Sequence, residues 1–212
     1  MVNDAPEHRL FAAIYDPATA VAERTILRPH RKYLATDLGD SVLDLGAGTG
    51  AMFPYLSTTD GRTLHAIEPD PHMRQQAIEK AAELGLDIDV SEAGAESLPY
   101  ADEQFDTVVA SMVFCTIPDI DAALAEVSRV LKPGGEFRFF EHVHADGWRG
   151  RIQNLAAPVW RRLAGGCHLN RQTVSHLTAS QSFDVLELER LDFGITPVWP
   201  FVRGRLRKRR SG

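Results

Sequence analysis

The residues with the clearest chemistry stand where a short apolar segment ends. Residues 42–45 lead directly into Gly46, Gly48 and Gly50, and Asp44 places a carboxylate at the end of that segment. Glycine at such a turn lets the backbone approach a ligand closely and adopt positive φ angles that other residues resist. A helix is expected to follow, and its free N–H groups favour a polar ligand above the turn. The pattern predicts a binding site for a nucleotide-type cofactor.

A second carboxylate, Glu68, ends the next apolar segment, 18 residues after Gly50. A carboxylate at that point can accept hydrogen bonds from both hydroxyls of a ribose. Its alternative role is to cap a helix, because Pro69 and Pro71 mark a turn into one. The ribose contact suits a dinucleotide as well as a single nucleoside. Glu68 therefore indicates a nucleoside without naming it.

The glycine spacing also fits the looser dinucleotide pattern Gly-x-Gly-x-x-Ala, which would end at Ala51. Three features argue against a nicotinamide cofactor. Asp44 would repel a pyrophosphate, whereas it attracts a cationic amine. No tyrosine is followed four residues later by the lysine of short-chain reductases. A chain of 212 residues also leaves little room for a separate substrate domain.

Strands and helices are expected to alternate along the chain. The expected strands are 41–45, 63–68, 86–90, 105–110, 136–140, 184–190 and 194–199. The expected helices cover most of the first 40 residues, a short piece after residue 50, and 71–84, 119–131, 152–163 and 171–180. Such alternation predicts an α/β fold with a parallel sheet between helices. Ligands of these folds bind at the carboxyl ends of the strands, where Asp44 and Glu68 stand.

The composition describes one globular domain. Hydrophobic residues make up 44% of the chain and charged residues 25%, and we expect a single domain over 1–202 with 1–40 as a helical cap. No apolar segment approaches the roughly 20 residues that span a bilayer. The polar N-terminus is no secretory signal, and the two cysteines provide no disulfide framework. We therefore expect a cytoplasmic protein.

Residues 203–212 are strongly basic, with six Lys or Arg and no acidic residue. The rest of the chain then carries 17 basic against 29 acidic residues, a net charge of −12. This charge argues against a broad nucleic-acid-binding surface. We expect the basic end to be a disordered, solvated tail; weak peripheral contact with an anionic membrane or RNA is the alternative. The sequence does not indicate the oligomeric state.

Five motifs in order resemble the class I S-adenosylmethionine-dependent methyltransferases. They are residues 44–50, Glu68, 95–99, 105–106 and 131–135, and the resemblance extends over 15–141. It implies a Rossmann-like, doubly wound, seven-stranded sheet that is mostly parallel with an antiparallel last strand. It also implies S-adenosylmethionine as the cofactor.

The resemblance implies a set of cofactor-binding residues: Tyr15, Asp44, Gly46, Ala47, Gly48, Gly50, Glu68, Pro69, Met73, Ala95, Glu96 and Ser111. In it, Asp44 and the glycine turn contact the methionine part, Glu68 the ribose, and Glu96 the adenine. Many members carry an aspartate immediately before the alanine of the adenine motif. Gly94 stands there, which leaves the adenine amino group to backbone acceptors or Glu96.

The C-terminal third resembles the alkyl-thiol methyltransferases of the methyltransferase-like group, and similar bacterial proteins often labelled lipid methyltransferases. The resemblance rests on residues 68–73, 139–143, Trp148, Trp160 and 165–171. It implies a small, fairly apolar acceptor, with a thiol as first choice. N- or O-methylation of a lipid head group or quinone-like ring is the alternative, and a non-catalytic, cofactor-binding regulatory protein is the second. Mammalian members carry an N-terminal membrane anchor, which we do not expect here.

Methyl transfer from a sulfonium is a one-step displacement, so the protein mainly holds the acceptor in line, about 3–3.5 Å from the methyl carbon. A thiol supplies some thiolate unaided, so a strong base is optional. We predict His142 as the base or orienting group, with a structural histidine as the alternative and Glu141 as a loop anchor. Cys167 and His168 are too few for a zinc site, so no metal is expected.

Overall fold

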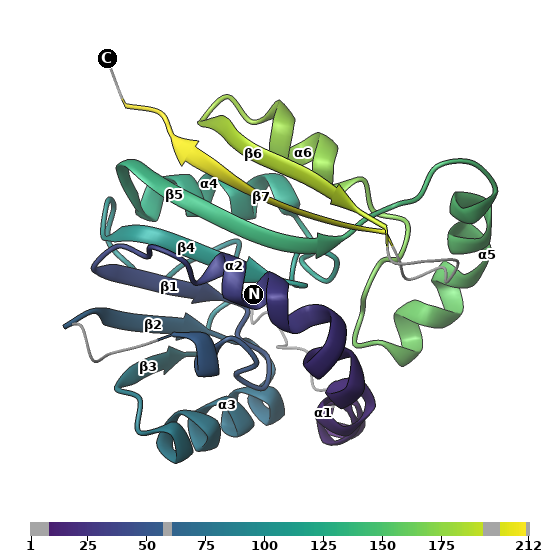
Figure 1. The fold of residues 1–212 in the computed structure, drawn as a ribbon, viewed down its shortest axis with the longest axis horizontal. Helices are drawn as coiled ribbons and strands as arrows, with labels where there is room; N and C mark the ends of the chain where they lie inside the picture. Colours follow the sequence, from purple (N-terminus) through teal and green to yellow (C-terminus); the bar gives the residue numbers. More distant parts are fainter. Residues whose placement is uncertain (1–8, 57–60, 193–199, 211–212) are drawn as a thin grey trace.

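The computed structural model describes residues 9–56, 61–192 and 200–210, which build one seven-stranded sheet with helices on both faces (Figure 1). The strands are β1 (Ser41–Leu45), β2 (Thr63–Ile67), β3 (Ile88–Ser91), β4 (Phe105–Ser111), β5 (Leu131–His142), β6 (Phe183–Leu191) and β7 (Phe201–Lys208). The helices are α1 (Arg9–Ala22), α2 (Arg28–Leu34), α3 (Pro71–Leu84), α4 (Ile120–Val130), α5 (Gly147–Leu163) and α6 (Thr173–Ala179), with a π-helical turn at Glu23–Leu27 and a 3-10 turn at Phe53–Tyr55.

The strand order is β3-β2-β1-β4-β5-β7-β6. Strands β1 to β5 pair in parallel, and β7 runs antiparallel to both of its neighbours, β5 and β6. The order reverses beside β1, so the carboxyl ends of β1 and β4 border a crevice in which such folds bind ligands. The predicted fold class, with its antiparallel last strand, is confirmed.

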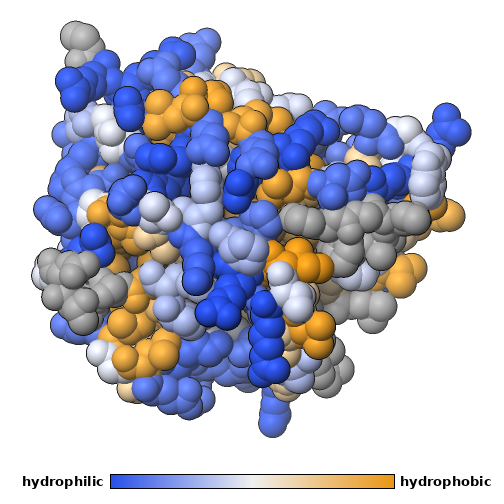
Figure 2. Space-filling model, viewed as in Figure 1, coloured by the Kyte–Doolittle hydropathy of each residue, from blue (hydrophilic) through white to orange (hydrophobic). Residues whose placement is uncertain are grey.

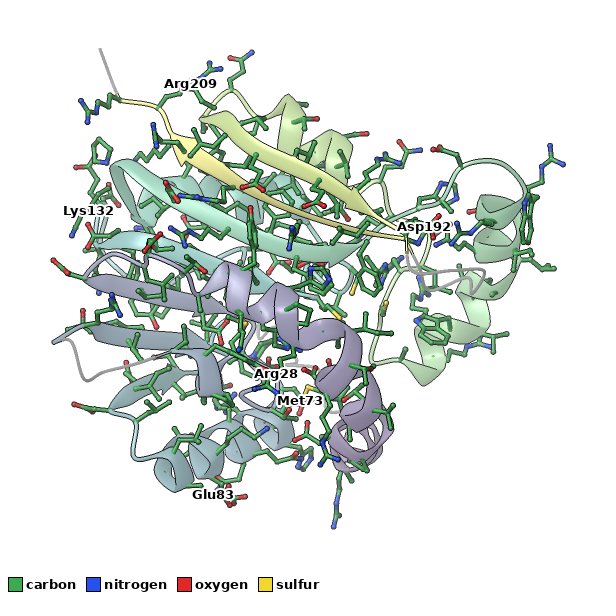
Figure 3. The ribbon with its side chains drawn as sticks, viewed as in Figure 1. Arg28, Met73, Glu83, Lys132, Asp192 and Arg209 are labelled. Carbon is green, nitrogen blue, oxygen red and sulfur yellow. The ribbon has the colours of Figure 1, made fainter. Side chains whose placement is uncertain are left out.

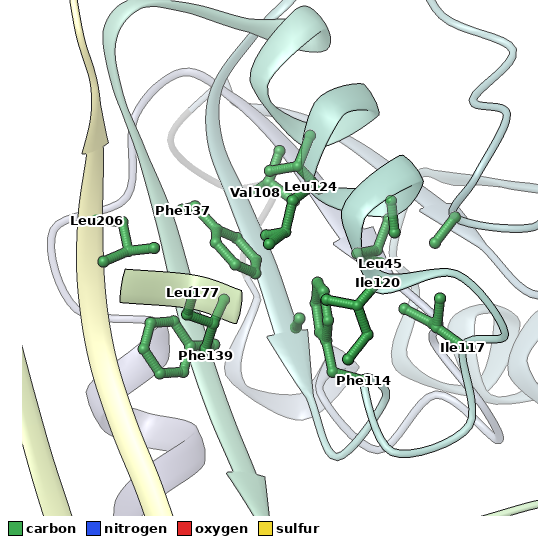
Figure 4. Close-up of a cluster of buried hydrophobic side chains, with 14 of the residues drawn as sticks. Leu45, Val108, Phe114, Ile117, Ile120, Leu124, Phe137, Phe139, Leu177 and Leu206 are labelled. Carbon is green, nitrogen blue, oxygen red and sulfur yellow. The ribbon is translucent and has the colours of Figure 1, made fainter. Parts of the chain in front are cut away.

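The central strand β4 is buried on both faces, as its apolar sequence predicts. Val108 belongs to a core that includes Phe114, Phe137 and Phe139, next to α4 and α6 (Figure 4). The adjacent Val109 belongs to a second core on the opposite face, which also contains Leu34. The two cores pack against both faces of the sheet and thereby hold the residues at its carboxyl edge in place.

The predicted disordered tail over 203–212 is wrong for residues 203–208, which lie in β7. The sequence alternates there, with Val202, Gly204 and Leu206 buried and basic residues between them, which is the pattern of a strand with one buried face. Arg203 pairs with a glutamate of β6 at 2.6 Å, and Arg205 with a glutamate of β5 at 2.8 Å. These two cations pair within the sheet, and contact of the remaining basic residues with a membrane stays a prediction.

The other elements lie close to their predicted positions. Helix α3 has the predicted bounds, whereas α5 begins at Gly147 rather than at 152. The strand expected at 194–199 lies outside the described residues. Among the described helices, α5 included, none has the length and apolar character of a membrane span.

Helix α5 projects from the body of the molecule (Figure 1) and exposes a row of large apolar side chains. Trp148 is 57% exposed and Leu155 83%, and orange patches mark this side of the molecule in Figure 2. Gln153 attaches the helix to the end of β5: its side chain accepts from Ala145 N at 2.6 Å and donates to Val143 O at 3.2 Å. The turn after α5 thereby returns toward the carboxyl edge of the sheet.

The N-terminal helices are fixed to the sheet by Arg138, which is 3% exposed. Its guanidinium donates to the carbonyl oxygens of Leu34, Thr36 and Asp37 at the end of α2. Because these carbonyls have no further helical turn to accept from, a cation there stabilises the helix end. Helix α2 is therefore positioned beside the site.

Candidate cofactor and acceptor site

The three glycines of the turn after β1 serve different purposes, although all have positive φ angles. A Cβ on Gly46 would lie 2.5 Å from Cγ1 of Val113, and one on Gly50 would lie 2.8 Å from Cδ2 of Phe53. A Cβ on Gly48 would meet nothing within 4 Å. Packing inside the protein therefore requires Gly46 and Gly50, whereas Gly48 borders open space. Ala47, buried between them, donates from its backbone to Ile67 O at 2.9 Å.

Asp44 is 1% exposed at the end of β1. Its Oδ2 has no hydrogen-bond partner within the described part of the chain. Burial raises the pKa of this carboxyl to about 7, against the attraction of Arg31 and with a further upward contribution from Glu68. A buried carboxylate lacking a donor fits a cationic amine such as that of the methionine part of S-adenosylmethionine.

Glu68 is 7% exposed and lies opposite the glycine turn. Its Oε2 accepts from Gly48 N at 2.8 Å and its Oε1 from Asp70 N at 2.9 Å. Burial raises its pKa, and these two N–H groups oppose the rise. Each carboxylate oxygen keeps a second lone pair for a ribose hydroxyl. The alternative role of helix cap belongs to Asp70, which accepts from the first backbone N–H groups of α3.

Glu68→Ala should weaken binding of S-adenosylmethionine by about 1–3 kcal/mol, because hydrogen bonds to a charged group are lost. Isothermal titration calorimetry measures the change directly. Glu79→Ala, which removes an exposed carboxylate of α3, is the matched control and should bind like the wild type. Unchanged affinity in the Glu68 variant would exclude this carboxylate from the site.

The adenine residues line the same edge near β3 and α3. Ala95 is buried, and Glu96 accepts from Asp119 N at 3.3 Å, at the start of α4. Pro69 is partly buried, and Met73 lies on the first turn of α3, on the side facing α1 (Figure 3). Their role in binding adenine stays a prediction.

The sequence reasoning missed Arg31, which is 2% exposed on α2. Its guanidinium donates to the Glu23 carboxylate at 2.5 and 2.9 Å and to Ser111 Oγ at 2.9 Å. The predicted Ser111 thus lies at the end of β4 beside a buried cation. Arg31 also attracts Asp44 electrostatically. Together, Arg31 and Asp44 supply the two charges that a zwitterionic amino-acid group requires.

Arg31→Lys should weaken S-adenosylmethionine binding by about 1–2 kcal/mol, because lysine cannot reproduce the forked hydrogen bonds of a guanidinium. Arg28→Lys, at an exposed position on the same helix, is the control and should leave the affinity unchanged. Calorimetry at matched ionic strength gives both values. Equal affinities for the two variants would assign Arg31 to the fold alone.

Helix α1 is fixed over the glycine turn by Asp16. This carboxylate accepts from Thr49 Oγ1 at 2.5 Å and pairs with Lys80 of α3 at 3.1 Å. Burial raises the pKa of the neighbouring Tyr15 to about 12, and this phenol is near enough to interact electrostatically with Arg31 and Cys115. The predicted Tyr15 therefore lies near both Arg31 and Cys115.

The loop after β4 is held by Glu141, as predicted. Its Oε1 accepts from Val113 N at 2.9 Å, its side chain is fully buried, and burial raises its pKa to about 7. The loop begins at Met112, whose φ of +61° is unusual for a residue with a side chain. Met112 N donates to Phe140 O at 2.8 Å. Strain of this kind gathers at functional sites.

His142 lies beside two cysteines, Cys167 and Cys115. Its Nε2 is 2.8 Å from Cys167 Sγ, and the ligand atoms of Cys115, His142 and Cys167 all lie within 4.8 Å of one another. Hydrogen bonds from Cys115 and His142 lower the pKa of Cys167, while the pKa of Cys115 is raised. The two thiols therefore differ in acidity, and Cys167 is the more acidic. Sequence spacing could not reveal this cluster, because its members come from three distant segments.

Comparisons with known proteins identify the family of the chain. Residues 43–139 match the family described as "Methyltransferase domain". Thiol S-methyltransferase TMT1A of Homo sapiens is 32% identical over 198 residues, which cover 91% of this chain and 79% of that protein. Sarcosine/dimethylglycine N-methyltransferase of Halorhodospira halochloris is 34% identical over 76% of this chain and 59% of its own length. The crystal structure of a SAM-dependent methyltransferase from Thermotoga maritima superposes with a TM-score of 0.70 at 20% identity, covering 95% of this chain and 97% of that one.

Proposed function

Because the chain belongs to the class I S-adenosylmethionine-dependent methyltransferases, we propose that it methylates the sulfur of a small, fairly apolar thiol. Methyl transfer from S-adenosylmethionine is the activity of the family. The identity of the acceptor is the additional step, and its support is the environment of His142.

The residues of the carboxyl edge fit the cofactor. When bound, S-adenosylmethionine supplies an electrophilic methyl group on a sulfonium. Asp44 and Arg31 would hold the charged ends of its methionine part, Glu68 would accept from the ribose, and Gly48 allows the ligand to lie against the backbone. These contacts orient the methyl group and contribute no proton transfer.

The single observation that carries the thiol proposal is the 2.8 Å separation between His142 Nε2 and a sulfur atom, Cys167 Sγ. This contact sets His142 against a sulfur atom, which supports a thiol or thiolate as the partner of His142 in the reaction. His142 is 8% exposed, and the cluster lies next to Tyr15, which borders the cofactor residues. An apolar, water-poor setting of this kind increases the nucleophilicity of a thiolate. A hydroxyl acceptor would need a stronger base than His142.

The reaction is a single displacement. The S–H proton of the acceptor passes to solvent, a bond forms between its sulfur and the methyl carbon, and the methyl–sulfonium bond breaks with its electron pair remaining on the cofactor's sulfur. His142 stabilises the acceptor thiolate, and Glu141 holds the loop after β4 so that the acceptor and the methyl group stay in line.

N-methylation is the second candidate. It is favoured by the 34% identity to sarcosine/dimethylglycine N-methyltransferase, but Glu141, the buried carboxylate next to His142, already holds the loop after β4 through Val113 N. The family membership also supports an enzyme over the non-catalytic regulatory protein that the sequence left open.

The test uses purified protein with methyl-labelled S-adenosylmethionine and acceptors that share one carbon chain: 1-hexanethiol, hexylamine and 1-hexanol, with phosphatidylethanolamine vesicles and a quinol as further arms. We expect the label in the thioether. His142→Asn should lower kcat/KM for the thiol by about 100-fold or more, with the cofactor affinity unchanged by calorimetry. Label transferred to the amine or the lipid instead would refute the thiol assignment.

A further inference from the structure

We propose that Cys115, His142 and Cys167 bind a Zn²⁺ ion whose fourth ligand is the sulfur of the acceptor. The metal site is inferred from the side-chain geometry alone. The role of the fourth ligand rests on the thiol acceptor proposed above, and with zinc bound His142 stabilises that thiolate through the ion rather than by direct contact.

The three donor atoms converge from separate parts of the fold. Cys115 belongs to the loop after β4, His142 ends β5, and Cys167 lies in the turn after α5. Their ligand atoms lie within 4.8 Å of one another. A tetrahedral zinc ion with bonds of about 2.3 Å to sulfur and 2.0–2.1 Å to nitrogen places its ligand atoms about 3.5–3.8 Å apart. The 2.8 Å contact between His142 and Cys167 needs to open by only about 0.7 Å to meet that geometry.

The donor set selects the metal. Two thiolates and one imidazole suit Zn²⁺, whereas Mg²⁺ and Ca²⁺ require oxygen ligands. All three side chains are at most 8% exposed, so charge balance is decisive. Two thiolates neutralise a divalent cation, which makes the buried complex neutral. Three protein ligands with one open position are also the arrangement of catalytic rather than structural zinc sites.

The backbone holds the two cysteines together independently of the ion. His168 N donates to Cys115 O at 2.9 Å, which ties the turn after α5 to the loop after β4. The guanidinium of Arg171 donates to Phe114 O at 2.8 Å and also to Ile117 O, on either side of Cys115. A site organised in this way loses little entropy when a metal binds.

A zinc ion there would explain how a thiol acceptor is activated at neutral pH. Coordination lowers the pKa of a thiol, so the S–H proton passes to solvent as the zinc–sulfur bond forms. The thiolate then attacks the methyl carbon, the methyl–sulfonium bond breaks, and the thioether product, a weaker ligand, leaves the ion. The position beside Tyr15 keeps this sulfur next to the cofactor residues.

The first measurement is metal binding by the full-length chain under reducing conditions. We expect about one Zn²⁺ per chain by mass spectrometry of the purified protein, and competition with a chromogenic chelator. Co²⁺ in place of zinc should give the intense thiolate-to-metal absorption of a tetrahedral site, and adding 1-hexanethiol should change that spectrum. A reduced wild-type protein that takes up neither metal would overturn the proposal, as would a Cys115–Cys167 disulfide forming with no effect of added zinc.

Variants assign the ligands. Cys115→Ser and Cys167→Ser should each weaken zinc binding by at least about 100-fold. His168→Gln, at the residue next to Cys167 but outside the cluster, is the matched control and should bind zinc like the wild type. Circular dichroism of each metal-free variant separates lost folding from a lost ligand. Equal zinc affinity in folded Cys167→Ser and wild type would overturn the site.

Activity distinguishes the two proposals from each other. Zinc binding without thiol methylation would refute the proposed acceptor and leave the metal site standing. Full thiol methylation by protein stripped of metal, in the presence of a chelator, would refute the catalytic ion and leave the acceptor standing. We expect stripping to lower the rate with the thiol at least about 100-fold and readdition of Zn²⁺ to restore it, with the affinity for S-adenosylmethionine unchanged in both states.

Discussion

Asp44→Ala should weaken S-adenosylmethionine binding by about 3 kcal/mol, or roughly 150-fold. The carboxylate is buried at the end of β1, and its Oδ2 has no partner elsewhere in the described chain. Removing it leaves the cofactor's amine without its counter-charge and leaves Arg31 with less compensation. Calorimetry at pH 8 measures the loss, and a change below threefold would exclude Asp44 from the site.

The pH dependence provides an independent check on Asp44. Burial raises its pKa to about 7 in the ligand-free protein, while a cationic amine binds only the ionised form. Affinity should therefore fall below pH 7, by up to tenfold per pH unit, and level off above it. Asp44→Asn should bind weakly and without this dependence. An affinity of the wild type that is equal at pH 6 and pH 8 would contradict the assignment.

The raised pKa of Asp44 also affects the stability of the ligand-free protein. Rising pH lowers that stability, whereas it increases cofactor affinity. Burial raises the pKa of Asp44 to about 7 in the folded state, above about 3.9 for an unfolded aspartate, so its contribution favours the fold below about 3.9 and is lost as the pH rises toward 7. Ligand-free Asp44→Asn should therefore unfold at higher denaturant concentration than the wild type at pH 8. Glu141 shifts in the same direction, but it is present in both proteins and cancels in the comparison.

The cofactor half of the site could be predicted from sequence because its geometry is local. A strand that ends in Asp44 and turns through Gly46 to Gly50 fixes the relative position of carboxylate and backbone within seven residues. Glu68 follows from the neighbouring strand, since adjacent parallel strands bring their carboxyl ends together. In the structure β1 and β2 pair in parallel, and Glu68 accepts from Gly48 N of the glycine turn.

Features that depend on long-range packing could not be predicted in the same way. Arg31 is one of several basic residues in its segment, and only the docking of α2 on β5 directs it to Ser111. The cysteine cluster joins residues 27 and 25 positions away from His142, a separation at which spacing carries no signal. The prediction of a disordered basic end was wrong for a different reason. It rested on the charge of the segment, whereas the alternation of buried and basic residues marks it as strand β7.

Gly46→Ala and Gly48→Ala should have opposite effects on fold stability and cofactor affinity, although the two glycines are separated by one residue. Gly46→Ala should destabilise the fold by about 3 kcal/mol, because the new Cβ combines a φ of +71° with a position 2.5 Å from Val113 Cγ1. Gly48→Ala should destabilise it by only about 1–2 kcal/mol, since φ is +59° and nothing lies within 4 Å. Urea unfolding without cofactor separates the two values.

Cofactor affinity should reverse that order once each variant is folded. Gly48 borders the space where the ligand lies, so its new Cβ meets the cofactor and should weaken binding at least about tenfold. Gly46→Ala combined with Val113→Ala removes the internal clash, and this double variant should regain stability and bind S-adenosylmethionine nearly normally. If Gly48→Ala bound the cofactor as tightly as the wild type, the ligand would not lie over this turn. The Gly48→Ala variant thus tests where the cofactor binds, and the Gly46→Ala variant tests why packing in this turn requires glycine.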